Sequence, residues 1–497
     1  MWRRCYNELK EVFTMFANNT PIHGFQYLTR KDISKLENWI WTGIVSIFIA
    51  YMSYTCYNLY TGFYSNPTVT TLVSTHFSVT NIPLPAIGIC SNNKLSKSRV
   101  ASFVTELSKR FNKSEQWLNK QVLWMGRLYD FELYGEDQRI EMQEMIDVLL
   151  KDKTYPISDI RFLMDSLAVS CDDLLVECYW MGEKRNCKEL FVRRLTNDGF
   201  CCMFNYIRPI MKSAVNVHIP PLTPINSSYK ATSFDYNNGL KILINNMPED
   251  YLYSDLMFEG VLVQIFRRDI FPDSSNGDVT DVFCGMGYEA FLTLTTQHIK
   301  AEAPLKKYPK EIRGCVLDTE KISTYGTNTM SDCLVGCKIK AILALCGCIP
   351  FVIPYDEPHT VCTLLDIACL NKYKEKISTL YPYSIETNDL DHEKEDSIKC
   401  ECYPSCSRTD YNVHANYAQL NLRRNKSWEN THSFIHIFYA QSIMDLYETD
   451  VVMYWFELLS NIGGLCGLLL GVSVISIIEM FYYFLIFLYN IFTIRGK

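Results

Sequence analysis

Two long apolar stretches, one near each end of the chain, limit what this sequence can fold into. From Asn38 to His76 there is no Lys, Arg, Asp or Glu, and residues 39–60 are dense in Ile, Val, Phe, Tyr and Trp. A helix over residues 39–60 would rise roughly 33 Å, which is enough to cross the hydrocarbon core of a bilayer. We therefore expect a first transmembrane helix there.

The second stretch is longer than a membrane anchor needs to be. Leu458 to Ile494 contains a single charged residue, Glu479. As one helix it would rise roughly 55 Å, well beyond a hydrocarbon core of about 30 Å. Either the helix projects from the membrane or it is broken. The glycine-rich part from Gly463 to Gly471 could tolerate a break, provided that protein or water surrounds it.

The region between these stretches has the features of an extracellular domain. Residues 61–453 hold 17 of the 20 cysteines, which indicates an oxidising compartment. Glycosylation sequons at Asn112, Asn226 and Asn425 fit an extracellular surface. Lys and Arg are enriched before the first stretch and follow the second, as is typical of cytoplasmic flanks. We expect both termini in the cytosol and the middle outside the cell, with the lipid bilayer as a partner.

The fold class predicted is an α+β membrane protein with two transmembrane helices around a large disulfide-rich extracellular domain. Alternation of apolar and polar residues predicts strands at 240–244 and 260–265, and helical patterns cover 97–111 and 330–345. The expected division is a cytoplasmic N-terminus (1–38), a first transmembrane helix (39–60), an extracellular domain (61–453), a second transmembrane helix with the pore (454–490) and a cytoplasmic C-terminus (491–497).

Several classes of function are disfavoured. The formal net charge of −7 gives no reason to expect nucleic acid as a partner. The sequence shows no zinc-protease motif, nucleophile elbow or phosphate-binding loop, so we expect no enzyme and no cofactor. A zinc site at Cys346-Gly-Cys348 is disfavoured, because thiols in an oxidising compartment form disulfides and the spacing matches no common zinc finger. We expect no metal site.

The cysteine spacing in the last third of the chain is the most specific signal. Cys333 and Cys337 are four residues apart, so on a helix they share a face. Cys400 and Cys402 are two apart, so on a strand they share a face. This pattern indicates nested bridges between a helix and a strand. The complete set is Cys315, Cys333, Cys337, Cys346, Cys348, Cys362, Cys369, Cys400, Cys402 and Cys406.

Together with the second apolar stretch, this spacing resembles the epithelial sodium channel/degenerin family. The run from Asn461 to Glu479 is similar to that family's pore helix, and the resemblance continues in one order from His23 onward. Cys333-Leu-Val-Gly-Cys337 and the following Leu345-Cys-Gly-Cys-Ile-Pro350 are most similar to the arthropod pickpocket branch. Further similar segments are Ile22-His23-Gly24, Leu84-Pro-Ala-Ile-Gly-Ile-Cys90 and Gly199-Phe-Cys-Cys-Met-Phe-Asn205.

For the extracellular domain, the resemblance implies finger, thumb, palm, knuckle and β-ball parts. Residues 97–200 would be finger-like and 315–406 thumb-like. The implied disulfides are Cys90–Cys201, Cys178–Cys187, Cys315–Cys406, Cys333–Cys402, Cys337–Cys400, Cys346–Cys369 and Cys348–Cys362. The pairing of Cys171, Cys202 and Cys284 stays open, and an odd number of cysteines implies a free thiol or an intermolecular bridge. Acid-sensing relatives carry a Trp just before Cys315, whereas this chain has Glu311-Ile-Arg-Gly314.

For the pore, the resemblance implies that Gly471, Val472 and Ser473 form the selectivity filter. Asn461, Gly464, Leu468 and Glu479 would line the pore, and His23, Gly24 and Ser460 would take part in gating. On physical grounds alone, the glycine ladder favours a helix-packing stripe without conduction, and the extra length of the segment with its carboxylate is what favours a pore. Glu479 could equally mark an ion path or make a hydrogen-bonded helix contact.

The function predicted is one subunit of a trimeric, sodium-preferring, amiloride-sensitive cation channel of the plasma membrane, gated through its extracellular domain. The permeant ion would be Na⁺, and the trimer could contain copies of this chain or related subunits. Two alternatives are a two-span trimeric channel of the ATP-gated type and a two-anchor receptor without conduction. The gating stimulus and any extracellular ligand stay open.

Overall fold

The structure is a computed structural model that divides into two compact units. The first unit comprises Met1–Val69, Ala303–Arg313 and Asp450–Lys497, and the second comprises Thr70–Glu302 and Gly314–Thr449. Residues described are 2–30, 32–65, 67–133, 139–153, 155, 157, 159–208, 229–230, 234–320, 329–354, 360–382, 398–421 and 426–495. Two predicted glycosylation sites, Asn226 and Asn425, lie outside these residues, whereas Asn112 is exposed at the end of a helix.

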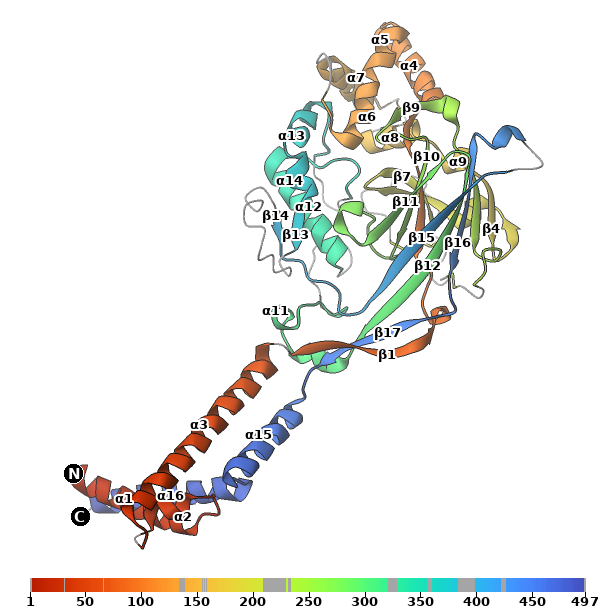
Figure 1. Ribbon diagram of the computed structural model, residues 1–497. Helices are drawn as coiled ribbons and strands as arrows, with labels where there is room; N and C mark the ends of the chain where they lie inside the picture. The colour runs from red at the N-terminus through yellow and green to blue at the C-terminus, as the bar shows by residue number, and fades with distance from the viewer. Residues whose placement is uncertain are drawn as a thin grey trace. The chain divides into compact units, whose positions relative to one another are not determined.

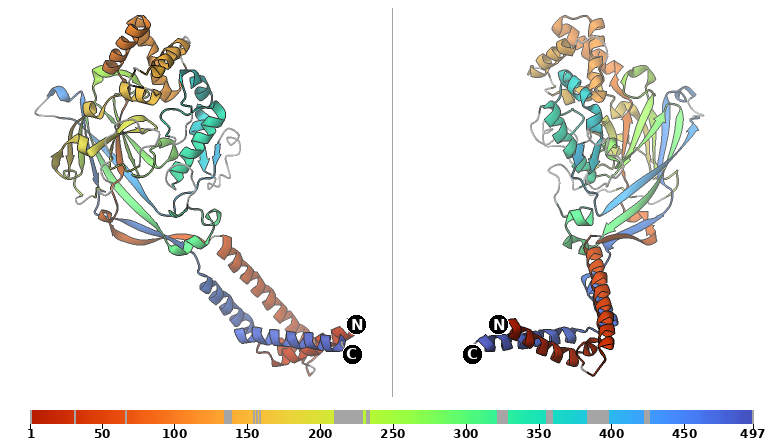
Figure 2. Two further views of the ribbon diagram at one scale, coloured as in Figure 1. Left: turned by 180° about the vertical axis from the view of Figure 1, so that it is seen from behind. Right: turned by 60° about the vertical axis from the view of Figure 1, so that its left-hand side comes forward.

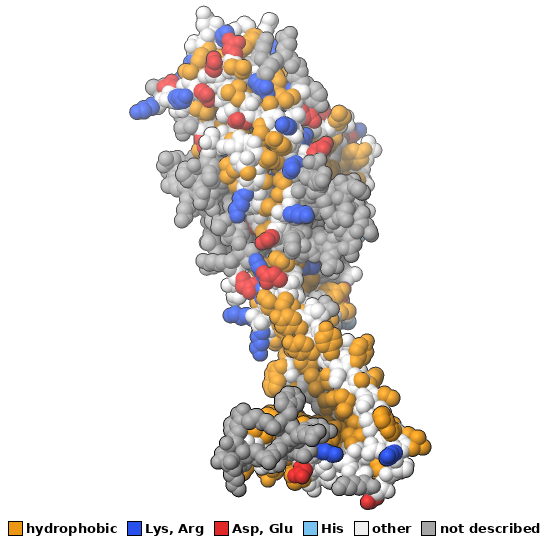
Figure 3. All heavy atoms as spheres, turned by 90° about the vertical axis from the view of Figure 1, so that its left-hand side faces the viewer, with side chains coloured by type: hydrophobic (Ala, Val, Ile, Leu, Met, Phe, Trp, Pro, Cys, Tyr) orange, Lys and Arg blue, Asp and Glu red, His pale blue; other side chains and the backbone are white. Residues whose placement is uncertain are grey.

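The first unit is almost entirely helical. Its helices are α1 (Trp2–Asn19), α2 (Phe25–Thr29), α3 (Lys35–Ser65), α11 (Lys310–Arg313), α15 (Trp455–Leu470) and α16 (Val474–Arg495), with a 3₁₀ turn η5 (Ala303–Lys307). Within the described residues, α3 and the part Val474–Ile491 of α16 are long and apolar enough to cross a membrane. Their large hydrophobic side chains are mostly exposed, and Figure 3 shows such side chains gathered over this unit.

The second unit contains a large mixed sheet. Over the described residues it has eight strands. Seven follow the order β1-β17-β12-β16-β8-β4-β5, and the eighth, β15, lies off this path and pairs with β12. The long strands β12 and β15 run side by side in both ribbon views (Figures 1 and 2). The strands are β1 (Thr68–Ser78), β4 (Leu175–Trp180), β5 (Glu183–Arg185), β8 (Leu240–Asn245), β12 (Tyr288–Ala301), β15 (Arg408–Gln419), β16 (His432–Tyr439) and β17 (Ile443–Val451).

A second, five-stranded sheet packs against the first one. Its order is β11-β10-β2-β7-β6 within the described part of the chain. Alternate residues of each sheet enter a shared core, for example Ile242 of β8 and Val263 of β10, both fully buried. The predicted strands at 240–244 and 260–265 are confirmed. The strands are β2 (Ala86–Ser91), β6 (Phe191–Thr196), β7 (Gly199–Phe204), β10 (Gly260–Phe266) and β11 (Val279–Gly285). Two short pairs, β3 (Asn93–Ser96) with β9 (Tyr251–Ser254) and β13 (Leu380–Pro382) with β14 (Ile398–Cys400), complete the strands described.

Two groups of helices share a separate hydrophobic core beside the sheets. Figure 1 shows α4 to α8 at one end of the sheets and α12 to α14 along one side. Ser96 caps the N-terminus of α4, and Thr329 caps the N-terminus of α12. Each side chain accepts a hydrogen bond from a backbone N–H of the first turn. The predicted helices at 97–111 and 330–345 are confirmed. The helices are α4 (Lys97–Phe111), α5 (Glu115–Gln121), α6 (Leu123–Asp130), α7 (Arg139–Lys151), α8 (Ile160–Leu167), α9 (Cys171–Leu174), α10 (Cys187–Leu190), α12 (Met330–Cys346), α13 (Ile367–Lys372) and α14 (Lys374–Ser378), with 3₁₀ turns η1 (Val79–Asn81), η3 (Pro248–Asp250), η4 (Ser274–Asn276), η6 (Leu364–Asp366) and η8 (Lys426–Trp428).

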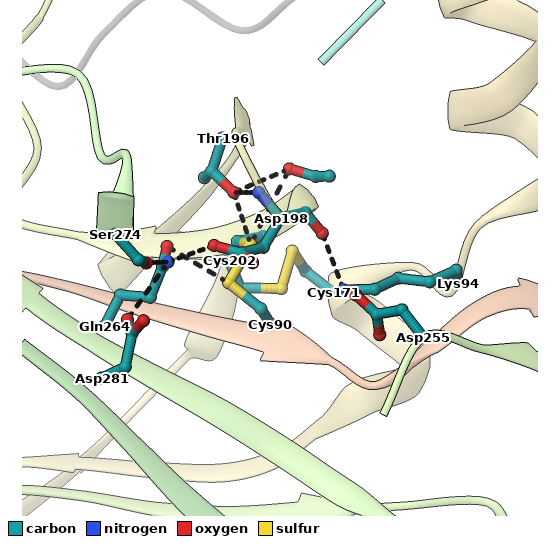
Figure 4. Close-up of a disulfide and its surroundings, with 12 residues drawn as sticks. Cys90, Lys94, Cys171, Thr196, Asp198, Cys202, Asp255, Gln264, Ser274 and Asp281 are labelled. Carbon is teal, nitrogen blue, oxygen red and sulfur yellow. Dashed lines mark hydrogen bonds and ion pairs between the residues drawn. A yellow bond between two sulfur atoms is a disulfide. The ribbon is translucent and has the colours of Figure 1, made fainter. Parts of the chain in front are cut away.

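Eight disulfides join described residues of the second unit. Seven of them join the same pairs that the family resemblance implies. The eighth joins Cys171 to Cys202 and leaves Cys284 as a buried free thiol. Cys201 and Cys202 are neighbours on β7, so their side chains point to opposite faces of the sheet and reach different partners, Cys90 and Cys171. Figure 4 shows Cys171 and Cys202 beside Cys90. A pairing left open by the sequence is therefore resolved by the strand geometry.

Candidate ion pore

The second apolar stretch is broken between α15 and α16. Gly471 ends α15 in the left-handed conformation, with φ of 67°. Its N–H donates to the carbonyl oxygen of Gly467 at 2.9 Å, and the N–H of Val472 donates to the carbonyl oxygen of Cys466 at 3.2 Å. This pair of hydrogen bonds is the usual glycine-dependent ending of a helix. The break thus falls at the tripeptide that the resemblance implies as the filter.

Ser473 begins the next helix. Its hydroxyl accepts a hydrogen bond from the N–H of Ser476 at 3.2 Å, while the N–H of Ser473 donates to the hydroxyl of Ser476 at 3.2 Å. Such reciprocal capping satisfies backbone donors that the first turn of a helix leaves unpaired. Gly471-Val472-Ser473 therefore ends one helix and starts the next through local hydrogen bonds. Irregular backbone within an apolar span must be surrounded by protein or water, because lipid offers it no hydrogen bonds.

The N-terminal part of the first unit lies directly against the break. The N–H of His23 donates to the carbonyl oxygen of Leu470 at 2.8 Å. A Cβ atom built on Gly471 would lie 2.9 Å from the imidazole ring of His23, so no larger residue fits there without movement. His23 and Gly471 are 448 positions apart in the sequence, and the fold brings them into contact.

Gly24, the second residue of the His-Gly pair, fits against α3. It has φ of 84°, a conformation that favours glycine, and an added Cβ would lie 2.7 Å from Cγ2 of Val45. One turn further, the rings of Tyr27 and Trp41 stack at 4.4 Å between centroids. The short helix α2 therefore packs against α3 through Gly24 and Tyr27.

The first helix, α1, packs against α16. The ring of Phe16 meets the ring of Tyr483 edge to face at 5.6 Å, and the side-chain amide of Asn19 donates to the hydroxyl of Tyr483 at 3.2 Å. Phe16, Ile22 and Leu470 form a small buried cluster. This cluster connects α1, the His-Gly turn and the end of α15 around the break.

The predicted pore-lining residues of α15 lie on one side of that helix. Asn461, Gly464 and Leu468 are all exposed, Leu468 to 82%. Their spacing of three and four residues places them on one face. Ser460 is also exposed, whereas Leu470 is buried. In the single chain, the face predicted to line a pore is thus exposed, with Asn461 donating to the sulfur of Met453 at 3.7 Å.

Glu479 lies on α16, six residues beyond Ser473. Its Oε2 atom is buried and has no hydrogen-bond partner. Ionisable groups within an apolar span usually face the interior of a helix bundle or a water-filled cavity, so an ion path and a helix contact both stay open for Glu479. Before the break, at the start of α15, the hydroxyl of Tyr454 donates to Oδ2 of Asp450 at 2.7 Å, which orders the first turn of that helix.

No dedicated metal centre accompanies these residues. Among the residues that the structure describes, no group of three or more His, Cys, Asp or Glu side chains is arranged to hold a metal ion. The geometry instead provides a broken apolar helix, a braced loop and one half-buried carboxyl group. This arrangement can expose backbone and hydroxyl oxygens to a hydrated cation without any catalytic group.

Comparison with known proteins decides the family. The model of the family described as "Amiloride-sensitive sodium channel" matches residues 16–483. The chain belongs to the amiloride-sensitive sodium channel family. This match includes the His-Gly turn, α3, the disulfide-rich domain, the break and Glu479, so the family assignment covers the whole candidate site.

Several relatives of the amiloride-sensitive sodium channel family align over almost the whole chain. Sodium channel protein Nach of Drosophila ananassae is 24% identical, over 97% of this chain and 87% of the relative. Pickpocket protein 28 of Drosophila melanogaster is 23% identical, over 96% and 78%. Acid-sensing ion channel 1 of Gallus gallus is 22% identical, over 94% and 82%. The similarity to pickpocket proteins agrees with the branch indicated by the cysteine segments.

Sequence reasoning missed several residues that support the site in this sodium channel family member. Val45, Leu470 and Tyr483 hold the His-Gly turn and the break, yet each is an ordinary apolar or aromatic residue within a helix. Near the outer end of α3, Phe63 meets Tyr308 edge to face at 6.4 Å. This aromatic contact comes from a residue seven positions before Cys315, and no sequence pattern singled it out.

Proposed function

We propose that this chain is one subunit of a trimeric, sodium-preferring and amiloride-sensitive cation channel of the plasma membrane. The extracellular domain would control opening, and the permeant ion would be Na⁺. Membership in the amiloride-sensitive sodium channel family supports the general function. The relatives named sodium channel protein Nach support sodium as the permeant ion.

The observation that carries this proposal is the break in the second apolar stretch. A membrane anchor needs one unbroken helix of about 20 residues, and a break exposes polar backbone that lipid cannot satisfy. Here Gly471 ends one helix, Ser473 starts the next, and His23 lies against the loop. A backbone loop that is braced on one side by the same chain fits a narrow, water-filled pore shared with neighbouring subunits.

The proposed topology places both termini in the cytosol and the disulfide-rich unit outside the cell. Eight disulfides support an oxidising compartment for the second unit. The His-Gly turn lies at the cytoplasmic side in this topology. His23 and Gly24 would therefore act at the inner mouth, and Ser460, ten residues before the end of α15, at the outer part of the pore.

The alternatives differ in what they require. An ATP-gated channel needs a cluster of Lys and Arg for phosphate, and this chain belongs to a different channel family. A two-anchor receptor needs no helix break and no half-buried carboxyl group in its second span. Family membership therefore opposes the ATP-gated alternative, and the helix break at Gly471 opposes the receptor alternative.

The decisive experiment is electrophysiology on the full-length chain, alone and with candidate partner subunits. We expect an inward current that disappears when external Na⁺ is replaced by a large organic cation and that amiloride reduces. Cell-surface labelling provides the control, since it shows that the protein reaches the plasma membrane. The proposal is contradicted if the protein reaches the surface but gives no Na⁺ current in any subunit combination, even under acid, peptide or mechanical stimulation. That outcome would support the receptor alternative.

A further inference from the structure

A small pocket opens on the face of the large sheet that points away from the second sheet. Its volume is about 140 Å³, and its walls come from β4, β8 and β16. The chain neighbours of the wall residues, Cys178, Ile242 and Ile435, are buried in the core that the two sheets share. Because side chains alternate along a strand, the pocket lies on the opposite face. The residues that line it are Glu177, Tyr179, Lys241, Leu243 and Phe434.

Strand pairing fixes how these five side chains lie. Leu243 is directly opposite Glu177 on one side and Phe434 on the other. In the next row along the strands, Lys241 is directly opposite Tyr179. Directly opposed side chains on one face of a sheet lie about 5 Å apart, so the pocket is formed by the sheet itself. It is therefore preformed, as small-molecule sites usually are.

The charges around the pocket leave one cation without a partner. Nζ of Lys184 donates to Oε1 of Glu177 at 2.5 Å, and the hydroxyl of Tyr179 donates to Oε2 of Glu177 at 2.7 Å, so both carboxylate oxygens are satisfied. Over the part of the chain that the structure describes, Lys241 forms no hydrogen bond or ion pair, although it is half-buried. A partly buried ammonium group without a counter-ion favours an anionic ligand.

The remaining wall of the pocket is apolar and held in place. The ring of Phe434 meets the ring of His436 edge to face at 4.5 Å, and His436 stacks on Phe291 at 4.5 Å. Nε2 of His436 is hydrogen-bonded to Oε1 of Glu289 at 2.7 Å, so this second carboxylate on the face also has a partner. Leu243 continues the apolar wall. An inorganic anion would leave that wall in water, whereas an organic anion with an apolar body covers it.

We propose that this pocket binds a small aromatic monocarboxylate. The carboxylate accepts a charge-assisted hydrogen bond from Nζ of Lys241, and the ring packs against Leu243 and Phe434. The volume limits the ligand to a single ring, since an apolar cavity of about 150 Å³ holds one benzene molecule. One negative charge on the ligand matches the one unpaired cation. None of these residues belongs to the candidate pore, so the site adds a ligand-binding function to the second unit.

Titration of the purified full-length protein in detergent with benzoate tests this proposal. Saturation-transfer NMR observes the ligand, and detergent without protein gives the background. We expect saturable binding of benzoate. Benzyl alcohol keeps the ring without the charge, and acetate keeps the carboxylate without the ring, so both should bind more weakly. The proposal is wrong if benzoate shows no saturable binding, or if either comparison ligand binds as tightly as benzoate.

Matched variants assign the binding to the pocket. Lys241→Gln should weaken benzoate binding about tenfold or more, which is the usual effect of losing a hydrogen bond to a charged group. Lys241→Arg keeps the positive charge and should retain binding. Lys109→Gln, which removes an exposed lysine of α4, should bind benzoate as the parent does. Equal binding by Lys241→Gln and the parent overturns the proposal.

Thermal unfolding shows whether each variant is folded. If Lys241→Gln does not fold, the comparison of benzoate with benzyl alcohol and acetate on the parent protein decides the outcome. The readout is ligand binding, so its result is independent of whether the chain conducts Na⁺.

Discussion

At the scale of single residues, Gly471 carries two constraints at once. Its backbone has a positive φ, and the imidazole of His23 occupies the space where a side chain would begin. Gly471→Ala should therefore cost about 1 kcal/mol for the backbone alone and should also displace His23. We expect a changed Na⁺/K⁺ preference or a loss of current at normal surface expression, measured by reversal potentials.

A second glycine provides the control for this substitution. Gly43 lies inside α3, and an added Cβ would meet nothing within 4 Å. Gly43→Ala should leave the current and its selectivity as in the parent, because alanine favours the helix. If Gly471→Ala behaves like Gly43→Ala, the contact with His23 has no part in conduction.

Asp198, in the second unit, has a carboxyl group in an unfavourable place for a charge. The amide of Gln264 donates to its Oδ2 at 2.6 Å, and Lys94 donates instead to its backbone carbonyl oxygen at 2.8 Å (Figure 4). Burial raises the pKa of Asp198 to about 6, with Asp281 and Asp255 adding to the rise and Lys94 opposing it. The folded protein therefore holds this proton more tightly than the unfolded chain.

This shift predicts the direction of a pH effect on stability. Because the pKa of Asp198 is raised in the folded protein, its contribution to the free energy of unfolding is most favourable below the ordinary pKa near 3.8. That contribution is lost as the pH rises to about 6. Asp198→Asn should increase the free energy of unfolding at pH 7.5 by about 1–2 kcal/mol and should have little effect at pH 4. Denaturant unfolding at both pH values measures this difference. An equal effect at both would show that the carboxyl group does not titrate in this range.

At the scale of elements, the disulfide between Cys171 and Cys202 joins the start of α9 to β7. It closes a segment with a sequence separation of 31 residues. Replacing both cysteines by Ser should lower the free energy of unfolding by up to about 3–4 kcal/mol, because the unfolded chain regains the freedom of that loop. The double variant avoids a new unpaired thiol at either position.

The measurement for this prediction is the thermal midpoint of the purified protein under non-reducing conditions. Cys284→Ser is a suitable control, since its thiol is buried in the same unit but forms no disulfide. A midpoint for the double variant that equals the parent's would show that Cys171–Cys202 adds no stability beyond that of the neighbouring Cys90–Cys201 bond.

At the scale of the whole molecule, the exposed face of α15 predicts how subunits meet. Ser460 and Gly464 are small and exposed on that face, so in the proposed trimer three copies can close together on the axis. Ser460→Val adds bulk that the closed state cannot accommodate, and the open state should gain population without a stimulus. We expect an increased resting Na⁺ conductance at matched surface level.

The control for this gating prediction is Ser460→Ala, which removes the hydroxyl without adding bulk. The alternative role for Ser460 is a hydrogen bond to a nearby backbone carbonyl, and both variants would remove it equally. Increased conductance in Ser460→Val alone supports a steric gate. A resting conductance no higher than the parent's in Ser460→Val removes Ser460 from the gate.

Much of the architecture follows from local patterns in the sequence. Two long apolar stretches, one without charges and one with a single Glu, predict two spans. Alternating residues predict strands such as β8 and β10, because burial on one face of an element is a periodic property. The helix stop at Gly471 and start at Ser473 are local as well, since each depends on backbone hydrogen bonds within a few residues. The disulfide pairs were implied by family resemblance rather than by such patterns.

The tertiary structure decided which distant residues meet, because contacts between elements leave no periodic trace in a single sequence. No local pattern indicates that His23 lies against Gly471, that Gly24 requires space beside Val45, or that Phe63 meets Tyr308. The partner of Cys202 likewise depended on which face of β7 it occupies. By itself, the sequence determined the two apolar spans, individual strands such as β8 and β10, and a glycine-rich part in which a break could be tolerated. The packing of helices and sheets then decided what braces the break, since only the fold brings these separated side chains together.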